Sequence, residues 1–324
     1  MFPTRKIFVP LAALALTGIA PLAHAQAYPT KAVRVVVPVA PGGGTDFLAR
    51  LLSLELTERA GHTFVVDNRA GAGGAIGSQL VASAPPDGYT LMMGYTASHG
   101  INPALSKLSY DPVKNFTQIS LVATATNMLV VHPSVAVRSV QELIALAKSK
   151  PGHLRYASAG NGTAPHMSGA LFDLMAGTEM IHVPYKGNGP ALVDVLGGHI
   201  ELTFASLPAG LPHGKAGKLR MVAVTSPKRS TLMPDLPTVA ESGLPGFNTD
   251  QWYGMVAPAA LPEPLVTRLH KDILSSVQDK DFVEKARGQG FEIVGSTPAQ
   301  FRTHIASEVA KWKDVVKKGN IRAD

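Results

Sequence analysis

Short apolar runs alternate with segments of helical periodicity along most of the chain. Residues 33–37 are almost entirely valine and stop at Pro38, and apolar side chains then recur at helical spacing over residues 47–56. Strands with so few polar positions, separated by helices, are typical of parallel sheets covered on both faces. The pattern predicts strands at residues 33–37, 63–66, 89–93, 127–131, 154–157, 180–183, 200–204, 219–224 and 252–257, and helices at residues 47–56, 73–82, 139–148, 164–176, 190–196, 264–277 and 298–316.

The alternation breaks at residues 232–248, where proline and glycine predict an irregular connector. The 324-residue chain also exceeds the ~250–300 residues beyond which single cores tend to split. We therefore predict an α/β fold of two lobes with mainly parallel sheets, the chain crossing near residues 123–128 and returning near residues 248–252. Lobe 1 is predicted at residues 26–125 plus 250–324, and lobe 2 at residues 126–249.

The amino terminus has the order of a secretory signal peptide. Arg5 and Lys6 precede a mostly apolar run over residues 7–20, and Ala23 and Ala25 frame a small-residue cleavage site. The run is shorter than the ~20 residues that span a bilayer. We predict a signal peptide at residues 1–25, cleavage after Ala25, and a soluble periplasmic protein.

The amino-acid composition excludes several classes of function. With 45% hydrophobic and 16% charged residues the chain is typical of a folded protein, and the absence of cysteine excludes disulfides, zinc fingers and thiol nucleophiles. Cleavage of residues 1–25 removes two of the 30 basic residues and none of the 23 acidic ones, which leaves a net charge of +5. This mild positive charge favours small anions and gives no support for nucleic-acid binding.

Three predicted strand-to-helix junctions are rich in glycine and hydroxyl side chains, at residues 41–46, 71–74 and 158–163. Ligands of open α/β sheets bind at such junctions, where helix N-termini present unpaired N–H groups and a partial positive charge. A carboxylate or phosphate is the natural guest. The same residues could equally serve as ordinary loop glycines and helix caps.

Motifs of enzymes and nucleotide-binding proteins are incomplete. No lysine follows the glycine-rich turns at P-loop spacing, and residues 71–77 are one residue off the dinucleotide fingerprint. Ser98 and Ser158 both lack the first glycine of a nucleophile elbow. The histidines show no metal-binding spacing. We therefore predict no catalytic residue, no metal and no cofactor.

A series of short blocks carries a resemblance to one family. It includes VPVAPGGGTD at residues 37–46 and HVPYKG at residues 182–187, with further blocks at residues 68–74, 86–90, 110–112, 197–198, 217–220, 237–243 and 252–254. Through them the mature chain, from about Tyr28 onward, resembles the Bug family, the extracytoplasmic receptors of tripartite tricarboxylate transporters. The resemblance implies a two-lobed periplasmic binding protein of type II-like, Venus flytrap architecture.

The resemblance also implies a small organic acid as ligand, held in a cleft between the lobes, and a two-subunit membrane permease as partner of a monomeric receptor. Dicarboxylates, tricarboxylates, aromatic carboxylates and amino acids are the expected ligand classes. The implied ligand-binding residues are Pro41, Gly42, Gly43, Gly44, Thr45, Asp46, Thr96, Ala97, Ser98 and Asn102 in lobe 1, and Gly160, Asn161, Gly162, Thr163, His166, Tyr185, Lys186, Ala205 and Ser206 in lobe 2.

Two positions qualify this picture. Asp46 is awkward beside an anion, so it either caps its helix or receives an ammonium or hydroxyl group of the ligand. The family often carries Phe-Asp where Phe204 is followed here by Ala205 and Ser206. Loss of that carboxylate favours plain organic acids over ligands that bear an amine.

Two other functions stay open at this level. An orphan receptor could serve as a co-sensor in signalling rather than in transport. A secreted hydrolase would need an activated nucleophile or paired acids, which the sequence does not indicate.

Overall fold

The computed structural model describes Met1 and residues 28–185 and 187–321. Apart from Met1, the signal peptide predicted at residues 1–25 lies outside the described residues, as does Lys186. None of the helices in the described part combines the length and the apolar character that a membrane span requires.

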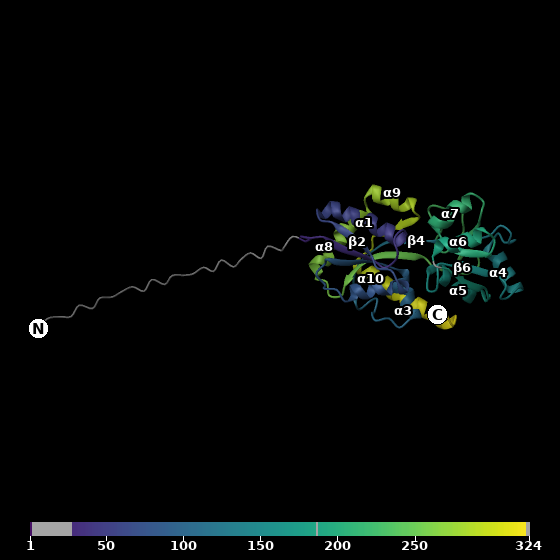
Figure 1. Ribbon diagram of the computed structural model, residues 1–324, viewed down its shortest axis with the longest axis horizontal. Helices are drawn as coiled ribbons and strands as arrows, with labels where there is room; N and C mark the ends of the chain where they lie inside the picture. The colour runs from purple at the N-terminus through teal and green to yellow at the C-terminus, as the bar shows by residue number, and fades with distance from the viewer. Residues whose placement is uncertain (2–27, 186, 322–324) are drawn as a thin grey trace.

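The first lobe, labelled with α1, α8 and α10 in Figure 1, is built on a six-stranded sheet. The order of its strands is β11-β4-β10-β3-β1-β2. Helices α1 (Gly44–Ala60), α8 (Glu263–Val277) and α9 (Lys280–Gly288) pack on one face, and α2 (Ala75–Ala82) and α10 (Pro298–Lys318) on the other. The strands are β1 (Val33–Val37), β2 (Phe64–Asn68), β3 (Thr90–Tyr95), β4 (Phe116–Ala125), β10 (Gln251–Pro258) and β11 (Phe291–Ile293).

The second lobe is built on a five-stranded sheet of order β7-β6-β8-β5-β9. Helices α4 (Val140–Ser149) and α5 (Ala164–Ala176) cover one face, and α6 (Asn188–Leu196) and α7 (Leu207–Lys215) the other. The strands are β5 (Asn127–Val131), β6 (Arg155–Ser158), β7 (Ile181–Pro184), β8 (Leu202–Ser206) and β9 (Arg220–Val224). The predicted two-lobed α/β class is confirmed.

Both sheets are mixed, whereas the sequence pattern predicts mainly parallel ones. Parallel pairing joins β2-β1-β3 and β7-β6-β8. Strands β4, β5 and β10 run antiparallel to both of their neighbours, and β5 and β10 begin where the chain arrives from the other lobe. Within each lobe, the turns that follow the parallel strands therefore lie at one edge of the sheet.

Two short helical segments connect these elements in lobe 1. A 3₁₀ turn, η1 (Ala72–Gly74), precedes α2, and a π-helical turn, η2 (Ala97–Ile101), leads from β3 into α3 (Asn102–Leu105). Single-turn π segments of this kind are frequent at functional sites.

The chain passes from one sheet to the other at two places that contact each other. Thr126 alone separates β4 from β5, and residues 225–250 lead back from β9 to β10. Asn127 N–H donates to Thr225 Oγ1 at 3.0 Å, and Ser226 N–H donates to Thr126 Oγ1 at 3.1 Å. Hydrogen bonds between the two passages hold them side by side.

Asp250, at the end of the return passage, is expected to make the stability of the protein depend on pH. Burial raises the pKa of Asp250 to about 7, with smaller contributions from Glu292 and Glu308, against a hydrogen bond from Thr126 and the charge of Lys311. The folded protein then holds a proton that the unfolded chain releases at lower pH. The free energy of unfolding should therefore fall as the pH rises from about 4 to 7.

The variant Asp250→Asn is expected to remove this slope and to be more stable than the wild-type protein above pH 7. Denaturant titrations at pH 5, 6, 7 and 8 measure the effect. Glu241→Gln is a matched control, since the pKa of that exposed carboxyl is lowered by Thr238 and Arg229. An equal slope in the wild-type protein and in Asp250→Asn would refute the prediction.

Candidate ligand-binding site

A cavity of about 770 Å³ lies between the two lobes. Lobe 1 lines it with the turn before α1, with Gly73, with the end of β3, and with residues of β10 and β11. Lobe 2 lines it with residues from the turns that follow β6, β7 and β8. The cavity thus lies against the same sheet edges that hold the glycine-rich turns.

Among the described residues, four helices begin at this cavity, and none of these four has a side-chain cap. The N-cap residues are Gly43 of α1, Thr163 of α5, Gly187 of α6 and Ser206 of α7, and all four line the cavity. Thr163 instead donates its hydroxyl to the carbonyl oxygen of Gly160, at 2.6 Å. The first N–H groups of these helices are therefore left without a cap from their own N-cap side chains.

Three of the helices that begin elsewhere have side-chain caps, whereas α2, α3 and α8 have none. Ser139 accepts from the backbone of α4, Asp279 from that of α9, and Thr297 forms a full capping box with Gln300 on α10. Capping side chains are therefore present at the N-termini of α4, α9 and α10, which lie away from the cavity. Uncapped N-termini that converge on one cavity form an environment suited to an anion.

The side chains around the cavity are uncharged throughout the part of the chain that the structure describes. Asp46 lies next to the cavity but is buried, and its Oδ2 accepts from Gly42 N–H at 2.9 Å and from Arg50 Nε at 3.0 Å. Burial alone would raise the pKa of Asp46, yet the hydrogen bonds from Arg50, Gly42 and Asn68 lower it overall. The carboxylate is therefore ionised and already paired, with the backbone before the N-cap and with two side chains rather than as a helix cap.

One wall of the cavity is aromatic. The rings of Phe47 and Phe291 are stacked with centroids 6.0 Å apart, and Tyr253 meets Phe291 edge-on at 5.2 Å. A Cβ atom on Gly44 would lie 3.2 Å from the Phe291 ring, so glycine lets the start of α1 approach this wall closely. The cavity therefore has donor groups at the helix ends and an apolar surface beside them.

The structure brings most of the predicted residues together and leaves others aside. Lys186 lies outside the described residues. The predicted residues that line the cavity are Pro41, Gly42, Gly43, Gly44, Thr45, Thr96, Ala97, Asn161, Gly162, Thr163 and Ser206. Those that do not line it are Asp46, Ser98, Asn102, Gly160, His166, Tyr185 and Ala205.

The side chains in the second group have partners within the fold. Asn102 Nδ2 donates to the Gly73 carbonyl oxygen at 2.7 Å, and Tyr185 donates to Asp194 at 2.5 Å. Ser98 Oγ lies 2.9 Å from His99 Nδ1, and Ala205 is buried in the core beneath α6 and α7. These residues shape the walls around the cavity without lining it.

Sequence reasoning missed the aromatic wall and the polar lining residues Gln251 and Gln289, whereas Asn188 lies in the predicted loop at residues 185–188. Tyr253 lies within the block at residues 252–254 that carries the family resemblance, and this signal could have identified it. Phe291 is brought to the cavity by the three-residue strand β11, which is too short to show a period.

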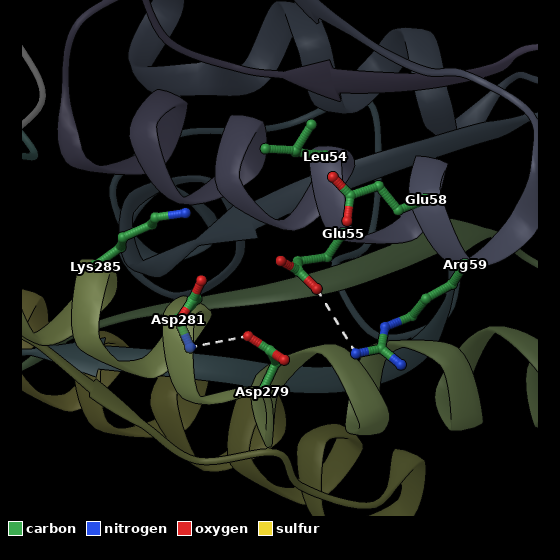
Figure 2. A pocket seen from close by; sticks show the side chains of 7 residues that line it. All are labelled: Leu54, Glu55, Glu58, Arg59, Asp279, Asp281 and Lys285. Carbon is green, nitrogen blue, oxygen red and sulfur yellow. Dashed lines mark hydrogen bonds and ion pairs between the residues drawn. The ribbon is translucent and has the colours of Figure 1, made fainter.

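A second hollow, of about 360 Å³, lies between α1 and α9 and holds a cluster of carboxylates (Figure 2). Asp279 accepts from the N–H groups of Asp281 and Phe282, and Glu55 pairs with Arg59 at 3.6 Å. Within the described residues, no group of histidine, aspartate or glutamate side chains could hold a metal ion. Capping of α9 by Asp279 and the ion pair of Glu55 with Arg59 account for two of these carboxylates.

Two lobes joined by paired passages, with a cavity of uncapped helix N-termini between them, define a two-lobed solute-binding protein. Residues 48–321 match the model of the tripartite tricarboxylate transporter family receptor. The chain therefore belongs to this receptor family, and the resemblance found in the sequence is confirmed.

Similar proteins agree with this assignment over nearly the whole chain. Protein BugT of Bordetella pertussis is 36% identical over 318 residues, which cover 97% of each chain. A structure described as R. palustris Rpa4515 with adipate is 38% identical with a TM-score of 0.82, covering 91% of this chain and 99% of that one. MatC (Rpa3494) from Rhodopseudomonas palustris with bound malate is 31% identical with a TM-score of 0.79, covering 89% of this chain and 100% of that one.

Proposed function

We propose that this protein captures a small organic carboxylate in the cavity between its lobes and presents it to a two-subunit membrane permease. Its place would be the periplasm, after cleavage of the predicted signal peptide behind Ala25. The observation that carries the proposal is the set of four uncapped helix N-termini at an uncharged cavity. The adipate and malate in two similar structures support the carboxylate class.

The ligand would be an acid without an amino group. A bound α-ammonium group requires a carboxylate or several acceptors nearby, since an unpaired buried charge is costly. Asp46 is occupied by Arg50 and by the Gly42 N–H, and Ala205 stands where the family often has aspartate. The stacked rings of Phe47 and Phe291 would cover the apolar body of the ligand.

Binding would favour closure of the lobes. We divide the chain into lobe 1, residues 26–125 and 250–324, and lobe 2, residues 126–249, with the joint at Thr126 and at residues 248–250. A ligand that contacts the turns of both lobes is more stable in the closed state and shifts the population toward it. The closed protein would then present a different surface to the permease.

A thermal-shift comparison of adipate with 2-aminoadipate tests the ligand class. The two acids have the same chain and differ by one ammonium group. Adipate is expected to raise the melting temperature by several degrees at concentrations far above its Kd, because a ligand of the native state stabilises it by mass action. An NMR spectrum of the mixture after prolonged incubation should show the acid unchanged, as expected of a receptor.

Malate, benzoate and nicotinate extend the comparison to other classes of acid. Stabilisation by 2-aminoadipate but not by adipate would overturn the assignment to amine-free acids. A lack of response to every carboxylate, with a response to a neutral sugar, would overturn the anion site itself.

A further inference from the structure

The turns before α1 and α5 are built in the same way in the two lobes. In each, the residue before the N-cap donates its N–H to the side chain of the third helical residue. Gly42 N–H donates to Asp46 Oδ2 at 2.9 Å, and Gly162 N–H donates to His166 Nδ1 at 3.1 Å. The same backbone arrangement thus depends on a carboxylate in lobe 1 and on an imidazole in lobe 2.

His166 is held in place by a stack of rings behind the turn. Its ring lies 4.0 Å from that of His182, nearly parallel at 17°, and His182 in turn stacks on Tyr156 at 5.0 Å. His182 Nε2 lies 2.6 Å from Ser158 Oγ, which accepts from Gly160 N–H at 3.0 Å. Both glycines of the turn are therefore fixed from the same stack.

The turn leaves little room for another conformation. Gly162 has a φ of +72°, which favours glycine, and a Cβ atom there would lie 3.1 Å from Leu105 and 3.3 Å from Asn102 of lobe 1. Asn161, Gly162 and Thr163 line the cavity, whereas His166 and His182 do not. The two histidines therefore act on the cavity through the turn.

We propose that His166, backed by His182 and Ser158, is a positioning residue that holds the turn at residues 160–163 in its ligand-binding conformation. It does so only while Nδ1 is unprotonated, because the Gly162 N–H needs an acceptor there. This inference rests on the proposed carboxylate site. Protonation of His166 would therefore release the turn of lobe 2 at low pH. The turn of lobe 1 would not respond in the same range, because its acceptor is the ionised carboxylate of Asp46.

The groups that face the His166 ring come from two neighbouring strands. The titratable groups stacked behind it are His182 from β7 and Tyr156 from β6, whose hydroxyl donates to the His166 carbonyl oxygen at 3.4 Å. Asp173, further along α5, raises the pKa of Tyr156, and Lys186 lies outside the described residues. Burial, with a smaller contribution from His166, lowers the pKa of His182 to about 3, so the His182 ring stays neutral between pH 5 and 8.

The first arm of the test uses the ligand-free protein. In ¹H–¹⁵N spectra the Gly162 amide proton should resonate downfield, and its signal should follow the protonation of His166 as the pH is lowered. In His166→Asn, whose side-chain oxygen can replace Nδ1, the downfield shift should persist without the pH dependence. In His166→Leu the shift should be lost, while His99→Leu, at a buried histidine of lobe 1, should leave it unchanged.

The second arm measures adipate binding by calorimetry between pH 5 and 8. Loss of one buried acceptor should weaken binding about tenfold in His166→Leu and in the wild-type protein at low pH. His166→Asn should bind as well as the wild-type protein at pH 8 and keep its affinity at pH 5.

The outcomes separate this inference from the proposed function. If the wild-type protein binds no adipate, the choice of ligand fails, while the Gly162 amide signal still decides the role of His166. A Gly162 signal that is the same in His166→Leu and the wild-type protein would overturn the inference. Equal adipate affinity of His166→Leu and the wild-type protein at pH 8 would also overturn it.

Discussion

Replacing Gly43 with aspartate is expected to weaken carboxylate binding at least 100-fold while leaving the fold intact. Gly43 is the exposed N-cap of α1, with φ −88° and ψ 172°, and a Cβ atom there would meet nothing within 4 Å. Aspartate is a good N-cap and would place its own carboxylate on the free N–H groups. A ligand carboxylate about 4 Å away would then be repelled by about 4 kcal/mol at an effective dielectric of 20.

The matched control is Gly43→Asn, which caps the same N–H groups without a charge. Calorimetry with adipate should show at most a tenfold loss for asparagine, so the difference between the two variants measures the charge alone. Both variants should unfold within about 0.5 kcal/mol of the wild-type protein, because glycine is itself an acceptable N-cap. Full affinity in Gly43→Asp would mean that the ligand binds away from the start of α1.

Local patterns predicted many of the regular elements of the fold, but not α3, β4, α7, α9 or β11. The valine run of β1 and the helix α5 have the predicted bounds, because each shows its period within one segment and ends at a clear break. Helix α7 was not predicted, since Pro208 and Pro212 within it are breaker signals. Pro208 lies in the first turn of α7, where a helix tolerates proline because the N–H group that proline lacks would have no partner within the helix.

Some residues of the site could be predicted from neighbouring residues in the sequence, and others depend on contacts between distant segments. The glycine turn before α1 could be predicted, because its chemistry lies in consecutive residues. Phe291 could not, since it reaches the cavity only when β11 pairs with β4, far earlier in the chain. Tyr185 was expected to contact the ligand, but its partner is Asp194 on the next helix, and such a pairing leaves no mark in a linear motif.

Replacing Trp312 with alanine is expected to lower the free energy of unfolding by about 3–5 kcal/mol, the usual cost of removing a large buried aromatic side chain. Trp312 lies near the end of α10 and is fully buried. It packs in one cluster with Ile101 of lobe 1 and with Leu129 and Phe247 of lobe 2. The cavity left by alanine would therefore open at the contact between the lobes.

Trp312→Phe separates packing from hydrogen bonding, because it keeps a ring but loses the indole N–H that donates to Glu308 Oε2 at 3.0 Å. We expect a loss of about 1–2 kcal/mol for phenylalanine, since Glu308 also accepts from Trp252 and pairs with Lys311. Trp252 is the other tryptophan of the chain, so fluorescence-detected denaturation works in both variants. Equal losses in the two variants would assign the effect to the hydrogen bond, and a loss below about 1 kcal/mol in Trp312→Ala would show that this end of α10 does not join the lobes.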